Sequence, residues 1–211
     1  MSTPAVDLGK SPALIVIDMQ NGFCVAEGFM NKIGLGYEAS ASVIEPISRL
    51  LDSARTAGIP IVFTRYSLNS DYSDAGLLLE VFPQVEGTGG MVRATWDAAV
   101  VDGLAPLPGE IVIDKTRYSA FYDTDLEERL RALGVDTVIV CGVTTNICVE
   151  STVRDAFFRD IRCVVPADGT AAVTPALHEG ALEDFRYGFG QVGTVDEIVE
   201  ALAALPAAAR N

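Results

Sequence analysis

The sequence Ala-Leu-Ile-Val-Ile-Asp at positions 13–18 is a wholly apolar run that ends in a carboxylate. A short run of this kind is typical of a strand buried on both faces, as in the centre of a parallel sheet. It therefore predicts the first strand of such a sheet. Comparable apolar runs follow at 59–64, 111–113, 137–141 and 162–165, with a weaker one at 189–192.

Segments with apolar residues at helical spacing separate these runs. The segment 37–57 stops at Gly58, a residue type that commonly ends helices. Strands alternating with helices indicate an α/β fold, here a single doubly wound, mostly parallel sheet flanked by helices in three layers. The alanine-rich tail at 201–209 predicts the end of a helix followed by a frayed terminus. The other predicted helices are 125–133, 147–158, 175–185 and 196–205.

Length and composition favour one globular domain over positions 1–211, with 49% hydrophobic and 21% charged residues. The net charge of −14 repels phosphate groups, so we expect neither nucleic acid nor a membrane as a partner. Positions 1–12 lack the pattern of a signal peptide, and no apolar stretch reaches the roughly 18 residues that a membrane span needs. We therefore expect a cytoplasmic protein.

Three chemically reactive side chains follow predicted strands. In an open α/β sheet, ligands bind outside the carboxyl ends of the strands, where the strand order reverses. Asp18 ends the first predicted strand, Lys115 follows the third, and Cys148 lies in the turn after the strand at 137–141. These positions predict one site that combines an acid, a cation and a thiol. The long polar segment 65–96 is a further candidate for shaping the pocket.

Each of these residues also has a simpler interpretation. An aspartate after a strand often caps a turn, which would suffice to explain Asp18. Lys115 alone fits an exposed lysine with Asp114 as its partner. A single cysteine such as Cys148 is equally consistent with an inert buried thiol. Their expected convergence at one edge of the sheet favours the catalytic interpretation.

Cys148 is the strongest candidate for a nucleophile. The residues before it, Thr144 to Asn146, supply helix-capping side chains and predict that the thiol lies in the first turn of a helix. There the helix dipole and a neighbouring lysine would lower the thiol pKa. The same turn offers unpaired backbone N–H groups, which stabilise an oxyanion when sulfur attacks a carbonyl.

The other cysteines and the single histidine are weaker candidates. Cys141 and Cys163 fall inside apolar strands and are expected to be inert, while Cys24 is nearer the site but lacks a helix N-terminus. All four cysteines are expected to be reduced thiols, because their spacing suggests no disulfide scaffold. His178 is expected in a helix well away from the strand ends, so Asp18 is the better base for the thiol.

Metal and cofactor patterns are weak in this sequence. One histidine and no clustered thiols predict the absence of a zinc site, although an all-carboxylate magnesium site stays open. The pattern Gly-x-Gly-x-x-Ala at 34–39 matches a dinucleotide fingerprint, but no predicted strand precedes it. We therefore expect no metal and no organic cofactor.

Three longer motifs stand in order along the chain: LIVIDMQN at 14–21, KTRYSAF at 115–121 and GVTTNICVEST at 142–152. Together they resemble the isochorismatase-like cysteine hydrolases. The similarity covers positions 12–205 and includes the order of strands and helices. In that family, the motif positions that match Asp18, Lys115 and Cys148 form a catalytic triad.

The resemblance implies further features of the site. It implies a non-proline cis peptide between Val143 and Thr144, which would aim the Thr144 and Cys148 amides at the oxyanion. The nicotinamidase branch holds a metal with an aspartate and two histidines, a set that this chain lacks. True isochorismatases, which cleave a vinyl ether, tend to lack the cysteine, so Cys148 favours the amidohydrolase side. Family members are commonly oligomeric, which implies a homo-oligomer.

Within the family, the residues of these motifs most resemble those of the ureidoacrylate, biuret and N-carbamoylsarcosine hydrolases. This implies an amidohydrolase that cleaves a non-peptide C–N bond of a small amide, ureido or carbamoyl compound through a thioester acyl-enzyme, releasing ammonia or an amine. The alternatives are a vinyl-ether hydrolase and a catalytically silent family member that binds a ligand or partner. Substrate contacts are expected from Asn21, Phe23, Trp96 and Tyr118.

Overall fold

The computed structural model describes residues 6–206, which form a seven-stranded sheet whose paired strands are all parallel. The strand order is β3-β2-β1-β4-β5-β7, and the short β6 pairs with β4. The predicted doubly wound α/β fold is therefore confirmed. The strands are β1 (Pro12–Ile17), β2 (Ile61–Tyr66), β3 (Ile111–Lys115), β4 (Thr137–Val143), β5 (Arg162–Pro166), β6 (Thr170–Ala171) and β7 (Gln191–Gly193).

The two central strands explain the apolar runs in the sequence. β1 and β4 pair from Pro12 opposite Thr137 to Ile17 opposite Gly142, and every residue of both strands is buried. Because both faces are covered, these strands favour apolar side chains, and Thr137 at the start of β4 is the polar exception, with its hydroxyl bonded to Asp136. The strand order reverses between β1 and β4, so the residues that follow these two strands lie at the switch point, where ligands bind in open sheets.

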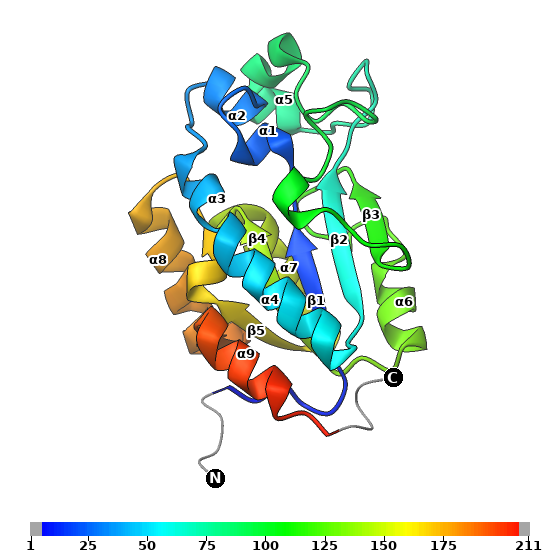
Figure 1. Cartoon of the computed structure of the whole chain (residues 1–211). Helices are drawn as coiled ribbons and strands as arrows, with labels where there is room; N and C mark the ends of the chain where they lie inside the picture. The colour runs from blue at the N-terminus through cyan, green and yellow to red at the C-terminus, as the bar shows by residue number, and fades with distance from the viewer. Residues whose placement is uncertain (1–5, 207–211) are drawn as a thin grey trace.

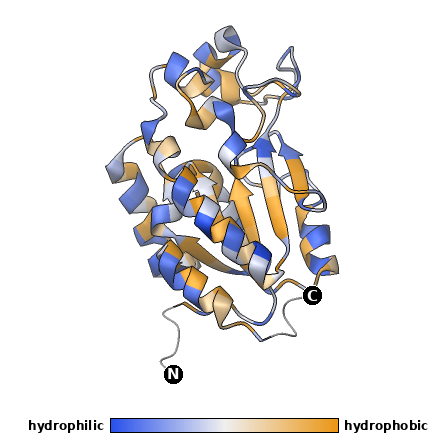
Figure 2. Ribbon diagram, in the orientation of Figure 1, coloured by the Kyte–Doolittle hydropathy of each residue, from blue (hydrophilic) through white to orange (hydrophobic). Residues whose placement is uncertain are grey.

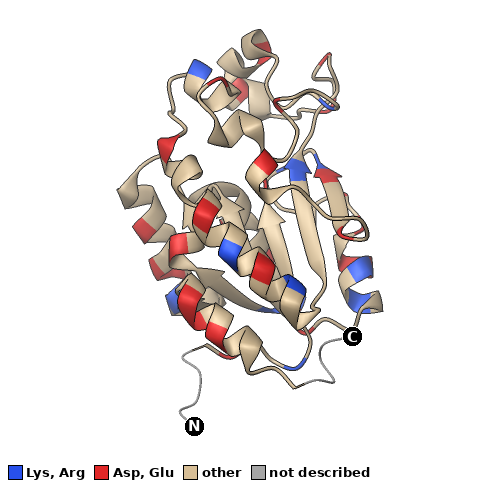
Figure 3. Ribbon diagram, viewed as in Figure 1, with Lys and Arg blue, Asp and Glu red and all other residues tan. Residues whose placement is uncertain are grey.

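Helices cover both faces of the sheet (Figure 1). α4 (Ile44–Ala57) and α9 (Val195–Ala203) pack against each other in front of it, and α7 (Glu150–Phe157) packs against β4 and β5 behind it. The helices in front carry alternating hydrophilic and hydrophobic residues, and the strands are mainly hydrophobic (Figure 2). Charged residues lie mostly on the outer helices and loops (Figure 3). This pattern follows from burying one stripe of each helix against the sheet.

Short helices surround the carboxyl ends of the strands, at the top of Figure 1. They belong mainly to the segment after β1 and to the long connection after β2, which the sequence marked as irregular. α6 and α8 flank the sheet elsewhere. The remaining elements are α1 (Asn21–Cys24), α2 (Phe29–Lys32), α3 (Glu38–Ser42), α5 (Leu78–Val81), α6 (Leu126–Ala132), α8 (Pro175–Asp184), the 3-10 helices η1 (Pro83–Thr88), η2 (Asp102–Leu104) and η4 (Ala167–Gly169), and the π-helical turns η3 (Thr145–Val149) and η5 (Phe185–Phe189).

Several predicted boundaries differ from the structure. The helix expected at 37–57 divides into α3 and α4 at Val43, the shared cap. The helix expected at 147–158 begins earlier, with the π-helical turn η3 that α7 then continues. Both changes occur within continuous apolar patterns, which carry no signal for a local change of helix type. Of the alanine-rich tail, positions 207–209 lie outside the described residues.

Candidate active site

The structure brings Asp18, Lys115 and Cys148 together at the switch point. Lys115 Nζ lies 2.6 Å from Asp18 Oδ2, and both side chains are fully buried. The Cys148 thiol, 4% exposed, is within hydrogen-bonding reach of both groups. Lys115 is therefore not an exposed surface lysine. Its neighbour Asp114 instead pairs with Arg65 at 2.7 Å.

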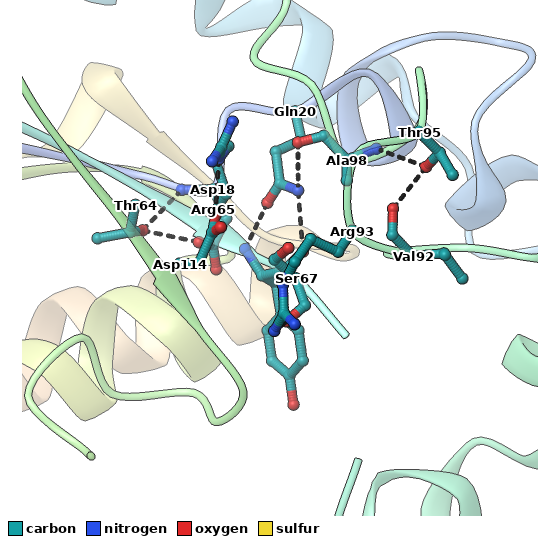
Figure 4. Close-up of polar contacts among 11 residues, drawn as sticks. Asp18, Gln20, Thr64, Arg65, Ser67, Val92, Arg93, Thr95, Ala98 and Asp114 are labelled. Carbon is teal, nitrogen blue, oxygen red and sulfur yellow. Dashed lines mark hydrogen bonds and ion pairs between the residues drawn. The ribbon is translucent and has the colours of Figure 1, made fainter. Parts of the chain in front are cut away.

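Asp18 is held by the strand beside it (Figure 4). Thr64 Oγ1 on β2 donates a hydrogen bond of 2.7 Å to Asp18 Oδ1, and the Asp18 backbone N–H donates to Thr64 Oγ1. Asp18 Oδ2 forms the ion pair with Lys115 and accepts no further N–H or O–H hydrogen bond from residues 6–206. One carboxylate oxygen is thus occupied by Thr64, and the other faces the lysine and the thiol.

Close packing of the two central strands brings the acid and the thiol near each other. Gly142 at the end of β4 has φ +109, and a Cβ there would collide with the carbonyl oxygen of Ile17. Only glycine allows this approach without a shift of the backbone. Asp18 follows Ile17 directly, and Cys148 follows Gly142 in the turn that starts the next helix.

Burial controls the protonation of the thiol. It raises the pKa of Cys148 to about 12, an effect that the nearby Lys115 ammonium opposes and the Asp18 carboxylate reinforces. The expectation that a helix N-terminus lowers this pKa is therefore wrong for the free protein. Burial also opposes the charged form of Lys115, but Asp18 and the Cys148 sulfur outweigh it and raise the lysine pKa above its ordinary value. The raised pKa values of both groups favour a protonated Cys148 thiol and a charged Lys115 in the free protein.

The peptide bond between Val143 and Thr144 is cis, as the resemblance implied. Thr144 precedes the turn η3, and its carbonyl oxygen accepts hydrogen bonds from the N–H groups of Ile147 and Val149. Thr144 and Cys148 both line the same cavity. The oxyanion role of their amides stays a prediction.

A cavity of about 280 Å³ opens onto Cys148. Its wall is formed mainly by the short helices at the carboxyl ends of the strands, together with η3 and α8. Most of the wall consists of apolar side chains, and its polar members, Tyr66, Tyr118, Thr144 and Asn146, are uncharged. The apolar side chains include Phe23, Phe29, Met30, Leu78, Phe82, Val85, Met91 and Leu177.

The four residues predicted to contact substrate fall into two groups. Phe23 and Tyr118 line the cavity. Trp96 does not line it and is instead 53% exposed. Asn21 is buried and donates from Nδ2 to the Trp96 carbonyl oxygen at 2.9 Å, so it ties α1 to the loop that carries Trp96. An aromatic or amide in a loop gives no sequence signal for the direction of its side chain.

Two buried polar residues that the sequence did not single out organise the cavity wall. Gln20 donates from Nε2 to the carbonyl oxygens of Tyr66 and Ala98, and its Oε1 accepts from the Tyr66 N–H (Figure 4). The Asp97 carboxylate accepts from the N–H groups of Phe29 and Met91, both at 3.0 Å. Gln20 could have been noticed as a polar residue two positions after Asp18, whereas Asp97 lies in a segment without a pattern.

The other three thiols do not line the cavity, whereas the histidine contacts the turn that bears Cys148. Cys141 and Cys163 are buried in β4 and β5 and donate to backbone carbonyl oxygens. Burial raises the pKa of Cys24 to about 12, and this residue does not line the cavity. His178 lies in a helix as expected, α8, but the expectation that it lies well away from the strand ends is wrong. Its Nδ1 lies 2.8 Å from Oγ1 of Thr145, within the turn that bears Cys148. A helix late in the sequence packs on that turn, which sequence spacing does not reveal.

The described residues form neither a metal cluster nor a membrane-spanning helix. Within residues 6–206, no group of three or more His, Cys, Asp or Glu side chains is arranged to hold a metal ion. Over the same residues, no helix has both the length and the apolarity to cross a membrane.

Comparison with known proteins places this architecture in a family. The isochorismatase domain matches residues 12–197. The ureidoacrylate amidohydrolase RutB of Methylorubrum extorquens strain AM1 is 40% identical over 205 residues, which cover 90% of this chain and 82% of that protein. RutB of Stutzerimonas stutzeri is 36% identical over 217 residues, which cover 96% of this chain and 87% of that protein. The chain belongs to the isochorismatase family.

Solved structures agree with this assignment. A cysteine hydrolase from Pseudomonas syringae pv. phaseolicola superposes with a TM-score of 0.85 and 32% identity, covering 96% of both chains. The N-carbamoylsarcosine amidase from Thermoplasma acidophilum has a TM-score of 0.74 and 28% identity, covering 88% of this chain and 97% of that one. The parallel sheet and its flanking helices are thus shared with these hydrolases.

Proposed function

We propose that this chain hydrolyses a C–N bond of a small amide or ureide with Cys148 as the nucleophile. The observation behind this proposal is the buried 2.6 Å contact between Lys115 and Asp18 beside the thiol, at the wall of a cavity. The chain is an amidohydrolase, as its similarity to the RutB proteins supports. Its partner is a small molecule, and association into a homo-oligomer stays a prediction.

The reaction begins with a proton transfer, because the resting thiol holds its proton. Asp18 Oδ2 accepts the proton of Cys148, and the charge of Lys115 stabilises the thiolate that forms. The sulfur then attacks the substrate carbonyl carbon, and a C–S bond forms. The resulting oxyanion accepts hydrogen bonds from the Thr144 and Cys148 amides.

The second half of the reaction returns the same proton. The tetrahedral intermediate collapses, the C–N bond breaks, and protonated Asp18 donates to the departing nitrogen, which leaves as ammonia or an amine. Water then attacks the thioester carbonyl carbon, and Asp18 accepts its proton. The second tetrahedral intermediate collapses, the C–S bond breaks, and Asp18 returns the proton to the Cys148 sulfur, so that release of the acid leaves the thiol and the Asp18 carboxylate as they were.

Release of ammonia from a panel of small amides and ureides tests this function. We expect ammonia from wild type and none from Cys148→Ser. Cys24→Ser is the matched control, because Cys24 is equally buried but lies outside the cavity wall, and it should keep wild-type activity. Ketone formation from isochorismate would favour the vinyl-ether alternative, and a folded wild type that releases no ammonia would favour a silent binding protein.

A further inference from the structure

We infer that the preferred substrate is an uncharged amide or ureide with a bulky apolar group, and that substrates bearing a carboxylate are selected against. This inference rests on the proposed function and names its substrate class. It follows from the charge and shape of the cavity that ends at Cys148.

The cavity wall has no charge with which to bind a carboxylate. No Asp, Glu, Lys or Arg is among the described residues that line it. The nearest cation, Lys115, has a fully buried side chain and is already engaged with Asp18 and with the Arg117 carbonyl oxygen. A substrate carboxylate in this cavity would lose its hydration without gaining a partner, which disfavours its binding.

Arg117 does not supply the missing charge. Its guanidinium faces a second hollow, which Tyr66 and Tyr118 share with the catalytic cavity. There its Nη1 donates to the carbonyl oxygens of Asp74 and Thr116 at 2.7 Å, and the group stacks over Tyr122. The guanidinium is thus engaged with backbone carbonyl oxygens and Tyr122, and Arg117 is not among the described residues that line the catalytic cavity.

The end of the cavity next to the thiol suits an amide or ureide. Asn146 lines it two residues before Cys148, and its Oδ1 is buried without a hydrogen-bond partner among residues 6–206. Buried acceptors in folded proteins nearly always have a partner. An N–H group of the substrate would satisfy Asn146 Oδ1 while the carbonyl carbon faces the sulfur.

The apolar part of the cavity wall suits an aromatic or branched aliphatic group. Phe23 and Phe29 form an edge-to-face pair in this wall, with ring centroids 4.9 Å apart, and Phe82 and Met91 add further apolar surface. The volume of about 280 Å³ lies just under the range of roughly 300–1,000 Å³ found for drug-sized ligands, so it fits a compact molecule. Ureidoacrylate, named for the RutB relatives, bears a carboxylate and lacks such a group.

Matched substrate pairs test the inference. The first pair is hexanamide and adipamate, and the second is benzylurea and 4-(ureidomethyl)benzoate. In each pair the second compound carries a carboxylate and the first is uncharged. We expect kcat/KM for ammonia release to favour the uncharged member about 100-fold or more in each pair. Equal or greater kcat/KM for the carboxylates would overturn the inference.

Binding to the inactive Cys148→Ser variant separates this inference from the proposed function. Calorimetry should give a Kd about tenfold or more lower for each uncharged member, whether or not the wild type releases ammonia. Tighter binding of the carboxylates would refute the substrate class, while an absence of ammonia from wild type would refute the proposed function alone. Asn146→Leu should raise the Kd of both members of a pair equally, by about tenfold. Unchanged Kd values in a folded Asn146→Leu would contradict the role given to this acceptor.

A charge placed at the rim provides the complementary test. Leu177 lines the cavity, and its exposure of 46% matches that of Leu133, which lies on the far side of the fold in the cap of α6. Leu177→Arg should narrow the preference for uncharged substrates about tenfold or more, and Leu133→Arg should keep the wild-type preference. An unchanged preference in Leu177→Arg would contradict the claim that missing charge sets the specificity.

Discussion

Thr64 donates a 2.7 Å hydrogen bond to Oδ1 of Asp18 and thereby directs Oδ2 toward Lys115 and the thiol. Asp18 itself has φ +49, an uncommon conformation for a residue with a side chain, so its direction depends on such contacts. The Asp18 carboxylate is thus positioned by a neighbouring strand as well as by its own.

Thr64→Val should lower kcat about 10- to 100-fold with little change in KM, because a hydrogen bond to a charged group contributes roughly 1.5–3 kcal/mol. Steady-state ammonia release measures this effect. Thr137→Val is the matched control, since Thr137 is an equally buried threonine that donates to Asp136 at the opposite end of the sheet. A similar fall in kcat for both variants would contradict the positioning role.

Lys115→Met should lower kcat about 10³-fold and also destabilise the fold by about 3–5 kcal/mol, because it leaves Asp18 buried without its partner. The burial of Lys115 is why its removal should affect stability as well as catalysis. Urea unfolding measures the loss, with Lys10→Met at an exposed lysine as the control. A Lys115→Met protein of wild-type stability or wild-type kcat would contradict the buried ion pair.

Alkylation by iodoacetamide should be slow at pH 7 and accelerate steadily from pH 8 to pH 11, because burial raises the pKa of Cys148 from 9.0 to about 12. The folded state then holds this proton more tightly than the unfolded state. The contribution of this proton to the free energy of unfolding is therefore fully present below pH 9 and is lost as the pH rises toward 12.

Cys148 should still react first, since it lines the cavity and Cys24, Cys141 and Cys163 do not. Peptide mass spectrometry of one sample follows all four thiols together. A labelling rate that is already at its plateau at pH 7 would show a preformed thiolate and contradict the protonated resting state.

Asp97→Asn should raise KM several-fold with a small effect on kcat, because Asp97 holds the backbone of Phe29 and Met91 in the cavity wall and does not contact the thiol. An amide cannot accept equally well at both positions, so stability should fall by about 1–3 kcal/mol. Asp102→Asn, at an exposed position, is the control for kinetics and melting temperature. A fall in kcat at constant KM would assign Asp97 a different role.

Much of the fold could be predicted because its cause is local. β1 and β4 are buried on both faces and are apolar apart from Thr137 at the start of β4. The positions of Asp18, Lys115 and Cys148 follow from the rule that strand ends converge at one edge. Contacts between distant segments could not be predicted. The bond between His178 and Thr145 and the contacts of Asp97 depend on how loops pack, and the thiol pKa depends on burial that no motif encodes.

Covalent catalysis by Cys148 is tested most directly by trapping the acyl-enzyme. Wild-type protein is quenched in acid during turnover of a slowly hydrolysed amide and digested for peptide mass spectrometry. The mechanism predicts a substrate-derived mass on the peptide that contains Cys148, absent from Cys148→Ser, which should also lack turnover. A substrate-derived mass on Cys24, with Cys148→Ser still active, would contradict the assignment of the nucleophile.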